Sequence, residues 1–427
     1  MGLRLEVALQ HAKGIGLLDL TTSMGLIMVL GFAQNLALAR ILGSEGFGHV
    51  AVVNAAMSFG QLFGALGITV AVLRHSSAQT EEDKAWAIYR TGLPFVLVSS
   101  ISVGFLLMLV TYSPLWVFDR QAGDWLPVAV LGLPASILFL LNTKYLQSRQ
   151  RMREKAVLDF SNRALIVVCI VAGTLYNGFR GFIVGGLVGV LAGAAMSTFR
   201  ISQIRPLNRV SSPVKRRELF TFGLWSVSTG LMGYVLTTAD VLCVSAILQE
   251  SSSTGLYGLA VVVQRVARIP SFAYLEATFP SLVRQTLNPE KFSSSRKRMQ
   301  RNMILLALGA SIGVGLVAPI LIPAVFGEDY QGSVSPLLIL LVGQVFWSIG
   351  AVHGRSLLAH GYVQGNFWAS GLSAGINIAA NLLLIPIFGI KGAAIATAIS
   401  QILWAVSVTV MCHWIEGRIL PNRKSLT

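Results

Sequence analysis

Residues 164–199 read ALIVVCIVAGTLYNGFRGFIVGGLVGVLAGAAMSTF, and Arg180 is the only charged residue among them. Two long apolar runs flank a short polar turn, and the apolar residues are continuous rather than alternating. A helix needs about 20 apolar residues to cross a bilayer, whereas a strand of an outer-membrane barrel alternates over about ten residues. The segment therefore predicts two membrane-spanning helices.

The same pattern recurs along the whole chain of 427 residues, of which 54% is hydrophobic and 12% is charged. A typical soluble domain has about 25% charged residues. Inside a bilayer only helices and closed barrels satisfy their own backbone polar groups. The sequence predicts an all-α integral membrane protein with about twelve transmembrane helices, near residues 15–38, 49–73, 91–113, 125–146, 157–176, 181–199, 219–247, 255–282, 303–325, 335–356, 364–387 and 392–414.

The positive charge of the chain, +15 overall, is divided unevenly between the predicted loops. When the loops are assigned alternately to two sides, 27 of the 33 Lys and Arg residues fall on the side of both termini, and 4 fall on the other. Because cytoplasmic loops carry an excess of Lys and Arg, we expect both termini in the cytoplasm. The charge then indicates contact with anionic lipid heads and no binding of nucleic acid.

An internal repeat divides the chain into two similar parts. Gly178-Phe179-Arg180-Gly181 matches Gly389-Ile390-Lys391-Gly392 at an offset of 211 residues, and three further landmarks match at offsets of 208 or 209. We expect two six-helix lobes, 1–205 and 219–427, joined by a basic cytoplasmic linker, 206–218. Six is an even number, so the lobes would form pseudo-symmetric bundles related by an axis along the membrane normal, with a central cavity for the substrate.

Small residues recur every four positions on one predicted helix of each lobe. They are Gly181, Gly185, Gly189 and Gly193 in the first lobe, and Gly392, Ala396 and Ser400 in the second. Residues this small let two helix backbones approach closely. We expect these faces to pack helices together within each lobe rather than to line the transport path.

Among the charged residues within predicted spans, five are candidates for a functional role: Asp19, Asp240, Arg265, Arg268 and Glu276. Asp240 and Arg265 lie at similar depth, and Arg268 shares a helix face with Arg265 because they are three residues apart. Asp240 could form a structural ion pair with one arginine, or a spare arginine could bind an anion such as a phosphate. Glu276 lies on the same stripe nearer the cytoplasm. We expect Asp19 to line a water-exposed mouth rather than to couple proton transport.

Neutral polar residues also lie in the predicted spans, among them Asn54, Gln61, Asn377 and Asn381. Hydrogen bonds between helices would explain them, and they are also candidates for lining a cavity that accepts sugars. The chain has no nucleotide-binding, metal-ligand or nucleophile motif. The sequence therefore predicts no cofactor, no metal site and no catalytic residue, and any uphill transport would draw on an H⁺ or Na⁺ gradient, a substrate gradient or a partner.

Three segments carry a resemblance to a known family. They are Ala39 to Gly48 (ARILGSEGFG), Val325 to Tyr330 (VFGEDY) and Leu384 to Thr397 (LIPIFGIKGAAIAT). With these segments the chain resembles the Wzx-type polysaccharide flippases of the multidrug/oligosaccharidyl-lipid/polysaccharide exporter superfamily. Asp240 lies where that family often has an aspartate. Gln249 departs from it, because a glycine is frequent at that position.

The resemblance implies a transporter rather than an enzyme. Such proteins flip an undecaprenyl-diphosphate-linked oligosaccharide from the inner to the outer leaflet of the bacterial cytoplasmic membrane, for O-antigen or exopolysaccharide synthesis. Arg265 and Arg268 would then bind the diphosphate, and a polymerase or export protein could be a partner. Two alternatives remain open within the superfamily: a cation-coupled exporter of drugs or small molecules, and a flippase for peptidoglycan precursors.

Overall fold

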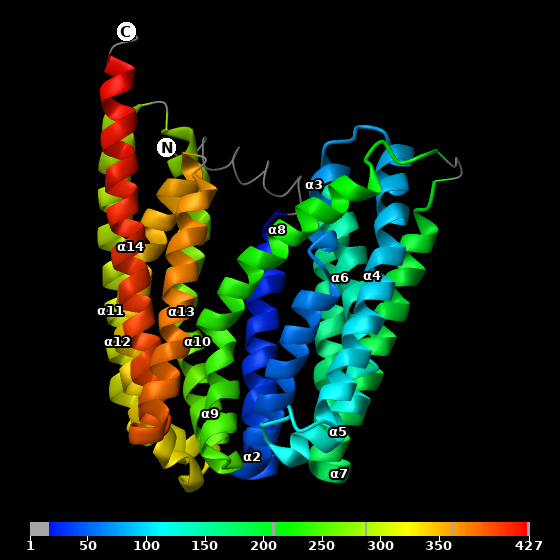
Figure 1. Cartoon of the computed structure of the whole chain (residues 1–427), viewed down its shortest axis with the longest axis vertical. Helices are drawn as coiled ribbons and strands as arrows, with labels where there is room; N and C mark the ends of the chain where they lie inside the picture. Colours follow the sequence, from blue (N-terminus) through cyan, green and yellow to red (C-terminus); the bar gives the residue numbers. More distant parts are fainter. Residues whose placement is uncertain (1–16, 207–209, 287, 361, 425–427) are drawn as a thin grey trace. The chain divides into compact units, whose positions relative to one another are not determined.

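A computed structural model describes residues 17–206, 210–286, 288–360 and 362–424, without the side chains of residues 17–24, 280, 363 and 416–424. All regular elements within this part of the chain are helical (Figure 1). They are α2 (Leu17–Gly64), α3 (Ile68–Ser77), α4 (Glu82–Thr111), α5 (Arg120–Val130), α6 (Leu133–Ser148), α7 (Met152–Gln203), α8 (Arg216–Tyr234), the π-helical turn η1 (Val235–Ala239), α9 (Asp240–Leu248), α10 (Ser251–Arg284), α11 (Pro289–Phe326), the 3₁₀ turn η2 (Glu328–Ser333), α12 (Val334–Ala359), α13 (Val363–Phe388) and α14 (Ile390–Lys424).

The described helices agree with the predicted spans. Eight of them are long and apolar enough to cross a membrane, and α5 with α6 forms a ninth span that is bent by 55°. α2 and α7 each contain a kink, at Gly43 and at Asn177–Gly178, which divides each into two helices. With these divisions and α10, the described helices account for twelve spans. The all-α integral membrane fold is confirmed, although the span predicted at 125–146 is broken rather than continuous.

The chain forms two compact units. The first comprises residues 1–42 and 52–231, and the second comprises residues 43–51 and 232–427. α8 begins in the first unit, and the spans that follow it lie in the second. The division into lobes at 205 and 219, drawn from the sequence repeat, stays a prediction. Each unit is described by itself below.

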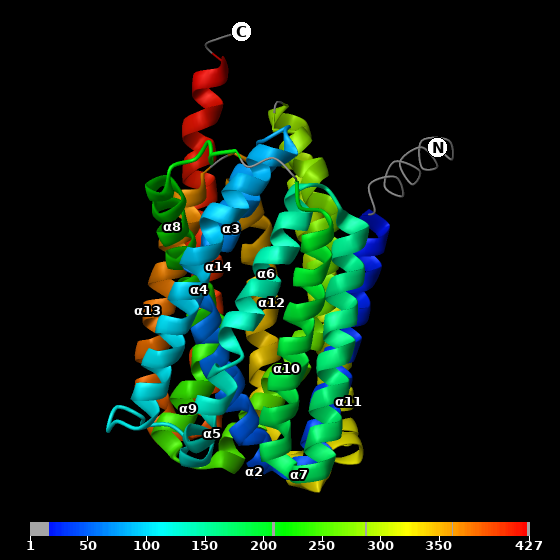
Figure 2. The same ribbon diagram turned by 90° about the vertical axis from the view of Figure 1, so that its right-hand side faces the viewer.

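In the first unit, α7 doubles back on itself at its kink (Figure 2). A Cβ atom added to Gly181 would lie 1.7 Å from the carbonyl oxygen of Gly173, and one added to Gly185 would lie 2.2 Å from that of Cys169. As the residue number rises from 181 to 185 in the second half of α7, the number of the contacted residue falls from 173 to 169 in the first half. The two halves of α7 are therefore antiparallel. The small face thus packs helices within one unit, as the sequence predicts, because any side chain there would force the backbones apart.

Glu154, near the beginning of α7, contacts residues at both ends of this helical hairpin. The carboxylate accepts a hydrogen bond from Nε of Arg200, at 2.8 Å, and pairs with Arg151 at 2.6 Å. Burial pushes the pKa of the Glu154 carboxyl up, and the hydrogen bonds from the two arginines outweigh that effect, so its pKa is lowered from the ordinary value. Glu154 is therefore charged at neutral pH, and it joins the beginning of α7 to its end.

The sequence repeat has a counterpart in the backbone. Gly178 has φ 53° and ψ −134°, and Gly389, 211 residues later, has φ 58° and ψ −138°. A positive φ with this ψ is accessible mainly to glycine. In each unit the chain then turns back so closely that a Cβ on the glycine three residues later, Gly181 or Gly392, would touch the preceding helix. At this landmark the two halves have the same backbone geometry.

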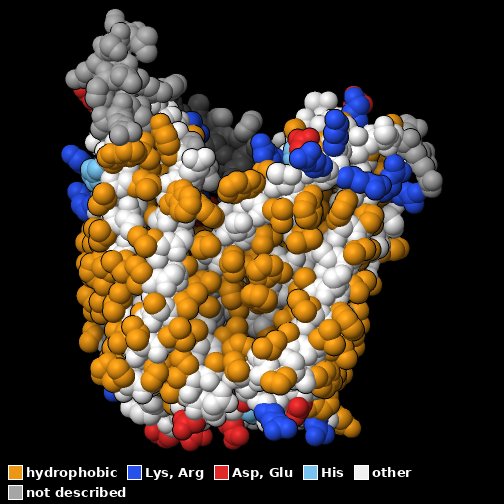
Figure 3. Space-filling view, viewed as in Figure 1, with side chains coloured by type: hydrophobic (Ala, Val, Ile, Leu, Met, Phe, Trp, Pro, Cys, Tyr) orange, Lys and Arg blue, Asp and Glu red, His pale blue; other side chains and the backbone are white. Residues whose placement is uncertain are grey.

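The surface of each unit has the polarity of a membrane protein (Figure 3). Hydrophobic side chains cover the middle of the visible face of each unit, and Lys and Arg side chains lie toward the ends, at the top and at the bottom of the view. On α4, for example, the large apolar residues Val98, Phe105 and Leu109 are 65%, 61% and 50% exposed. Exposure of this kind is favourable only where lipid surrounds the helices. The protein is therefore a multi-pass membrane protein.

Candidate functional site

The second unit contains a polar cavity of about 340 Å³ among its membrane-spanning helices. Its lining comes from η1, α9, α10, α12 and α14, and most of it is polar or charged. Polar surface at membrane depth is costly, and it marks substrate or ion pathways by default. The lining residues are Leu236, Thr237, Thr238, Asp240, Tyr257, Val261, Gln264, Arg265, Arg268, Leu340, Thr397 and Gln401.

A local irregularity in the helix shapes this cavity. Residues Val235–Ala239 form a π-helical turn directly before Asp240. Such turns disturb the regular pattern of backbone hydrogen bonds and occur often at functional sites. Here Nη2 of Arg265 donates a hydrogen bond to the carbonyl oxygen of Thr237, at 3.1 Å. The turn therefore supplies an acceptor to a cation in the cavity.

Asp240 is a buried carboxylate of the site, with only 4% of its surface exposed. Its carboxylate accepts hydrogen bonds from Nδ2 of Asn381, at 2.8 Å, from the hydroxyl of Tyr257, at 3.2 Å, and from the hydroxyl of Thr397. Asn381 in turn donates to Oδ1 of Asn377, at 3.1 Å. We call these five residues the Asp240 cluster. It joins α9, α10, α13 and α14 through neutral donors.

Among the described residues, Asp240 forms no ion pair with Arg265 or Arg268, and this corrects one of the two sequence-based interpretations. The oxygens of the carboxylate are already occupied by hydroxyl and amide donors. Arg265 instead reaches Thr237 and is exposed. The guanidinium of Arg268 lies over the ring of Trp347, 4.5 Å from its centroid, and its buried Nε has no hydrogen-bond partner. The two arginines thus keep donors that could bind an anion.

The remaining predicted site residues lie elsewhere. Glu276 forms an ion pair with Arg355 of α12, so the Glu276 charge is balanced within the second unit. Asn54 and Gln61 lie on α2 in the first unit, on one exposed face with Ser58. Asp19 belongs to α2, but its side chain lies outside the described residues. The structure therefore brings together Asp240, Arg265, Arg268, Asn377 and Asn381, and it does not add Glu276, Asn54 or Gln61 to them.

Sequence reasoning missed several members of the site, including Tyr257, Thr397, Gln264 and Trp347. Thr397 stood inside a quoted segment, at the end of LIPIFGIKGAAIAT, and Tyr257 lies between Gly255 and Gly258 in the sequence. A signal was present, because a hydroxyl in an apolar helix needs a hydrogen-bond partner. What the sequence could not show is that both hydroxyls meet the same carboxylate.

The chemistry of the cavity has two parts. No group of three or more His, Cys, Asp or Glu side chains suited to a metal ion occurs among the described residues. The Asp240 cluster instead combines one carboxylate with hydroxyl and amide oxygens, a set that suits a proton or a monovalent cation. The two arginines offer planar guanidinium groups, which match the geometry of phosphate oxygens. The cavity thus contains one group suited to a small cation and another suited to an anion.

Comparisons with known proteins agree with a membrane transport fold. The probable low-salt glycan biosynthesis flippase Agl15 of Haloferax volcanii is 24% identical over 333 residues, which cover 75% of this chain and 67% of that protein. The lipopolysaccharide biosynthesis protein WzxC of Escherichia coli K12 is 22% identical over 410 residues, covering 91% and 78%. The structure of the lipid II flippase MurJ in an inward closed conformation superposes with a TM-score of 0.76 at 14% identity, covering 92% of this chain and 87% of that one.

The sequence profile of one protein family spans most of the chain. It matches residues 37–335, which include the first two predicted landmarks of the resemblance, α9 with Asp240, and the whole of α10 with its arginines. By this match the chain belongs to the family of polysaccharide biosynthesis proteins.

Proposed function

We propose that this protein is a flippase, which moves an undecaprenyl-diphosphate-linked oligosaccharide from the inner to the outer leaflet of the bacterial cytoplasmic membrane by alternating access. It acts as a transporter and not as an enzyme. The sugar and diphosphate of such a substrate cannot cross hydrocarbon unaided, because a buried unpaired charge is very costly. A protein that shelters the head group while the lipid tail stays in the bilayer removes that barrier.

The observation that carries this proposal is the pair of arginines in the cavity of the second unit. Arg265 and Arg268 line a polar cavity at membrane depth, and neither has an ion-pair partner among the described residues. Evolution rarely keeps cations in a membrane span without a functional partner. A diphosphate would supply the missing acceptors, and a guanidinium can bind it through two parallel hydrogen bonds.

The Asp240 cluster is the candidate for energy coupling. The carboxylate is almost fully buried, and every partner that contacts it is neutral. A proton or Na⁺ bound there would cancel its charge, and release of that cation would leave the charge uncompensated. Such a change in charge can favour one conformation over another, since a ligand shifts an equilibrium by its differential affinity for the two states.

A cation-coupled exporter of drugs remains the main alternative, followed by a flippase for peptidoglycan precursors. The arginines of the cavity disfavour cationic cargo, because like charges repel at close range. Both flippase substrates carry a diphosphate, so the arginines do not separate them. The two flippase functions differ in the glycan that is attached to the lipid.

Complementation tests the proposal. A strain that lacks the gene would be supplied with the wild-type chain, and three properties would be measured: surface glycan, susceptibility to cationic drugs, and survival after depletion of the lipid II flippase. We expect restored surface glycan with unchanged drug susceptibility. Restored drug resistance without surface glycan would overturn the proposal in favour of the exporter, and rescue of lipid II depletion alone would identify the peptidoglycan substrate.

A further inference from the structure

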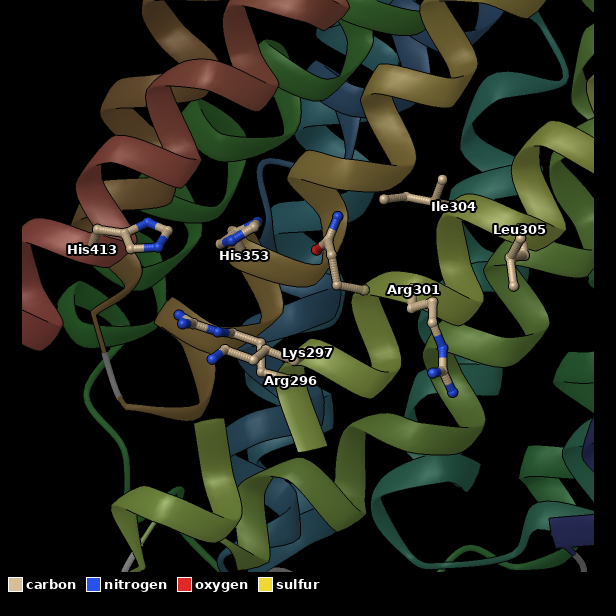
Figure 4. A pocket seen from close by; sticks show the side chains of 8 residues that line it. Arg296, Lys297, Arg301, Ile304, Leu305, His353 and His413 are labelled. Carbon is tan, nitrogen blue, oxygen red and sulfur yellow. The ribbon is translucent and has the colours of Figure 1, made fainter. Parts of the chain in front are cut away.

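A second pocket in the second unit is basic rather than mixed in charge. It has a volume of about 410 Å³ and lies between α11, α12 and α14, apart from the cavity around Asp240. Figure 4 shows His353 and His413 near Arg296 and Lys297 at one end of this pocket, and Arg301, Ile304 and Leu305 toward the other. None of the described residues that line it is an Asp or Glu.

The basic pocket contains polar groups without partners. Both polar atoms of the Gln300 side chain, Oε1 and Nε2, are buried and have no hydrogen-bond partner. A buried, unsatisfied amide costs about 1–3 kcal/mol, so a site that retains one usually has a ligand or water for it. Arg296, which is 8% exposed, is already fixed by a contact from its Nη1 to Sγ of Cys412, at 3.4 Å. The pocket is therefore partly preorganised for an oxygen-rich anion.

An apolar stripe leads away from the basic pocket along α11. Leu305, Leu308, Ile312 and Leu316 are 61%, 39%, 57% and 73% exposed, and their spacing places them on one helix face with Arg301. Arg301 and Ile312 are eleven residues apart, which corresponds to about 16 Å along a helix. This length is close to half of the roughly 30 Å hydrocarbon core. The stripe thus covers the depth of one leaflet.

We propose that α11, α12 and α14 form a binding site for an anionic phospholipid of the leaflet next to the basic pocket. The phosphate head lies between Lys297 and Arg301 with Gln300 as an additional partner, and an acyl chain follows the stripe from Leu305 to Leu316. The alignment of charge and apolar surface favours a phospholipid over a soluble anion, since a free phosphate would gain nothing from the stripe. A zwitterionic head would lose most of the attraction to the basic residues.

The test compares lipid binding by the full-length protein and by two charge-matched variants. The pocket variant carries Lys297→Gln and Arg301→Gln, which remove two cations of the site. The control variant carries Lys291→Gln and Arg298→Gln, which remove two exposed cations of the same helix that do not line the pocket. Each protein would be purified in a neutral detergent and titrated with phosphatidylglycerol, phosphatidylcholine or inorganic phosphate, with binding followed by native mass spectrometry and thermal stability.

We expect the wild-type protein and the control variant to bind phosphatidylglycerol equally. In the pocket variant the affinity should fall roughly 10- to 30-fold, since each basic residue near a membrane surface contributes about one tenfold factor or less. In all three proteins, phosphatidylcholine and inorganic phosphate should bind at least about tenfold more weakly than phosphatidylglycerol binds to the wild-type protein.

Two results would overturn the proposal. An equal loss of affinity in both variants would mean that the attraction is a diffuse effect of net charge, and inorganic phosphate that protects as well as phosphatidylglycerol would mean that the stripe does not contribute. Because this measurement needs no transported substrate, its outcome is independent of whether the protein proves to be a flippase.

Discussion

Each unit of the protein buries a network of polar side chains between helices, and the two networks differ in charge and in completeness. In the first unit Asn142 accepts a hydrogen bond from the hydroxyl of Tyr89, at 2.6 Å, and donates to Ser197 and Thr198, at 3.0 Å and 3.3 Å. All four side chains are neutral. The Asp240 cluster of the second unit has a carboxylate at its centre, and Oδ1 of Asn381 and Nδ2 of Asn377 in it lack partners.

This difference distinguishes a polar network that supports the fold from one that can take part in transport. A neutral and satisfied network fixes the positions of helices, and its state does not change during a transport cycle. A network with a buried carboxylate and spare oxygen and nitrogen atoms can gain or lose a cation. The Asp240 cluster also borders a cavity that contains two arginines. We expect substitutions in the two networks to have effects of different kinds.

The largest effect is expected from Asp240→Asn. The substitution keeps the shape of the side chain and removes its charge, so the protein should insert and fold. Ion-driven transport should fall by about 100-fold, near the upper end of the usual coupling free energies between two ligand sites (about 3 kcal/mol). Transport of a labelled lipid-linked oligosaccharide into proteoliposomes under imposed H⁺ and Na⁺ gradients measures this. Glu250→Gln, at the exposed carboxylate before α10, is the control and should behave as the wild type. Full gradient-dependent transport by Asp240→Asn would remove the cluster from energy coupling.

A somewhat smaller effect is expected from Arg268→Ala. Loss of one charge-assisted contact to a diphosphate costs about 1.5–3 kcal/mol, or roughly 10- to 150-fold in affinity. Arg268→Lys should recover part of it, because lysine keeps the charge and loses both the planar fork and the stacking on Trp347. Surface glycan and protein abundance would be measured together, with Arg284→Ala on the same helix as the control. An equal loss of abundance and export would show that Arg268 is structural instead.

For the first unit we expect Asn142→Ala to lower stability and not transport per molecule. Removal of the amide leaves the Tyr89 hydroxyl without its acceptor, and such a loss costs about 1–3 kcal/mol. The thermal midpoint of the purified protein should fall, while the transport rate of the folded fraction at low temperature stays near the wild-type value. A normal midpoint combined with abolished transport would contradict the distinction between the two networks.

The smallest effect is expected at Asn54 and Gln61. Both are exposed on one face of α2 in the first unit, and Ser58 on the same face bonds only to the Asn54 carbonyl. If this face borders the path of the glycan, Asn54→Ala with Gln61→Ala should lower export by about tenfold or less, the value of one or two neutral hydrogen bonds, at unchanged abundance. Replacement of both by leucine should then lower export further. Equal export by all three proteins would place the face in contact with lipid.

The sequence predicted much of the fold and less of the site. Continuous apolar runs predicted where the helices lie, since the length of a span follows from the thickness of a membrane. Several helices extend beyond the predicted limits, such as α4, which begins at Glu82 rather than 91, and α11, which begins at Pro289 rather than 303. The orientation inferred from Lys and Arg stays a prediction. The sequence repeat paired Gly389 with Gly178, and the backbone angles of the two glycines agree in the structure. The periodicity of apolar residues did not predict the π-helical turn before Asp240. Val235–Ala239 also contains no proline or glycine that would indicate an irregular helix.

The partners of Asp240 show a second limit of the sequence. Charge balance left open an arginine opposite Asp240, yet the donors to its carboxylate come from neutral residues 17, 141 and 157 positions away. Contacts at such separations depend on how α9, α10, α13 and α14 pack, which a single sequence does not encode in any local pattern. The prediction that charged residues within spans mark the site still led to the cavity, because such residues are too costly to retain without a role.

The central claim is that Arg265 and Arg268 bind the anionic head of a lipid-linked oligosaccharide. The most direct test reconstitutes the wild-type protein and the Arg265→Ala/Arg268→Ala variant at equal amounts in vesicles that carry the substrate with a fluorescent glycan. An impermeant reagent that quenches only the outer leaflet then measures translocation. We predict rapid translocation by the wild type and a decrease of about 100-fold or more in the variant, from the loss of two charge-assisted contacts. Translocation at the wild-type rate by a correctly inserted variant would contradict the claim.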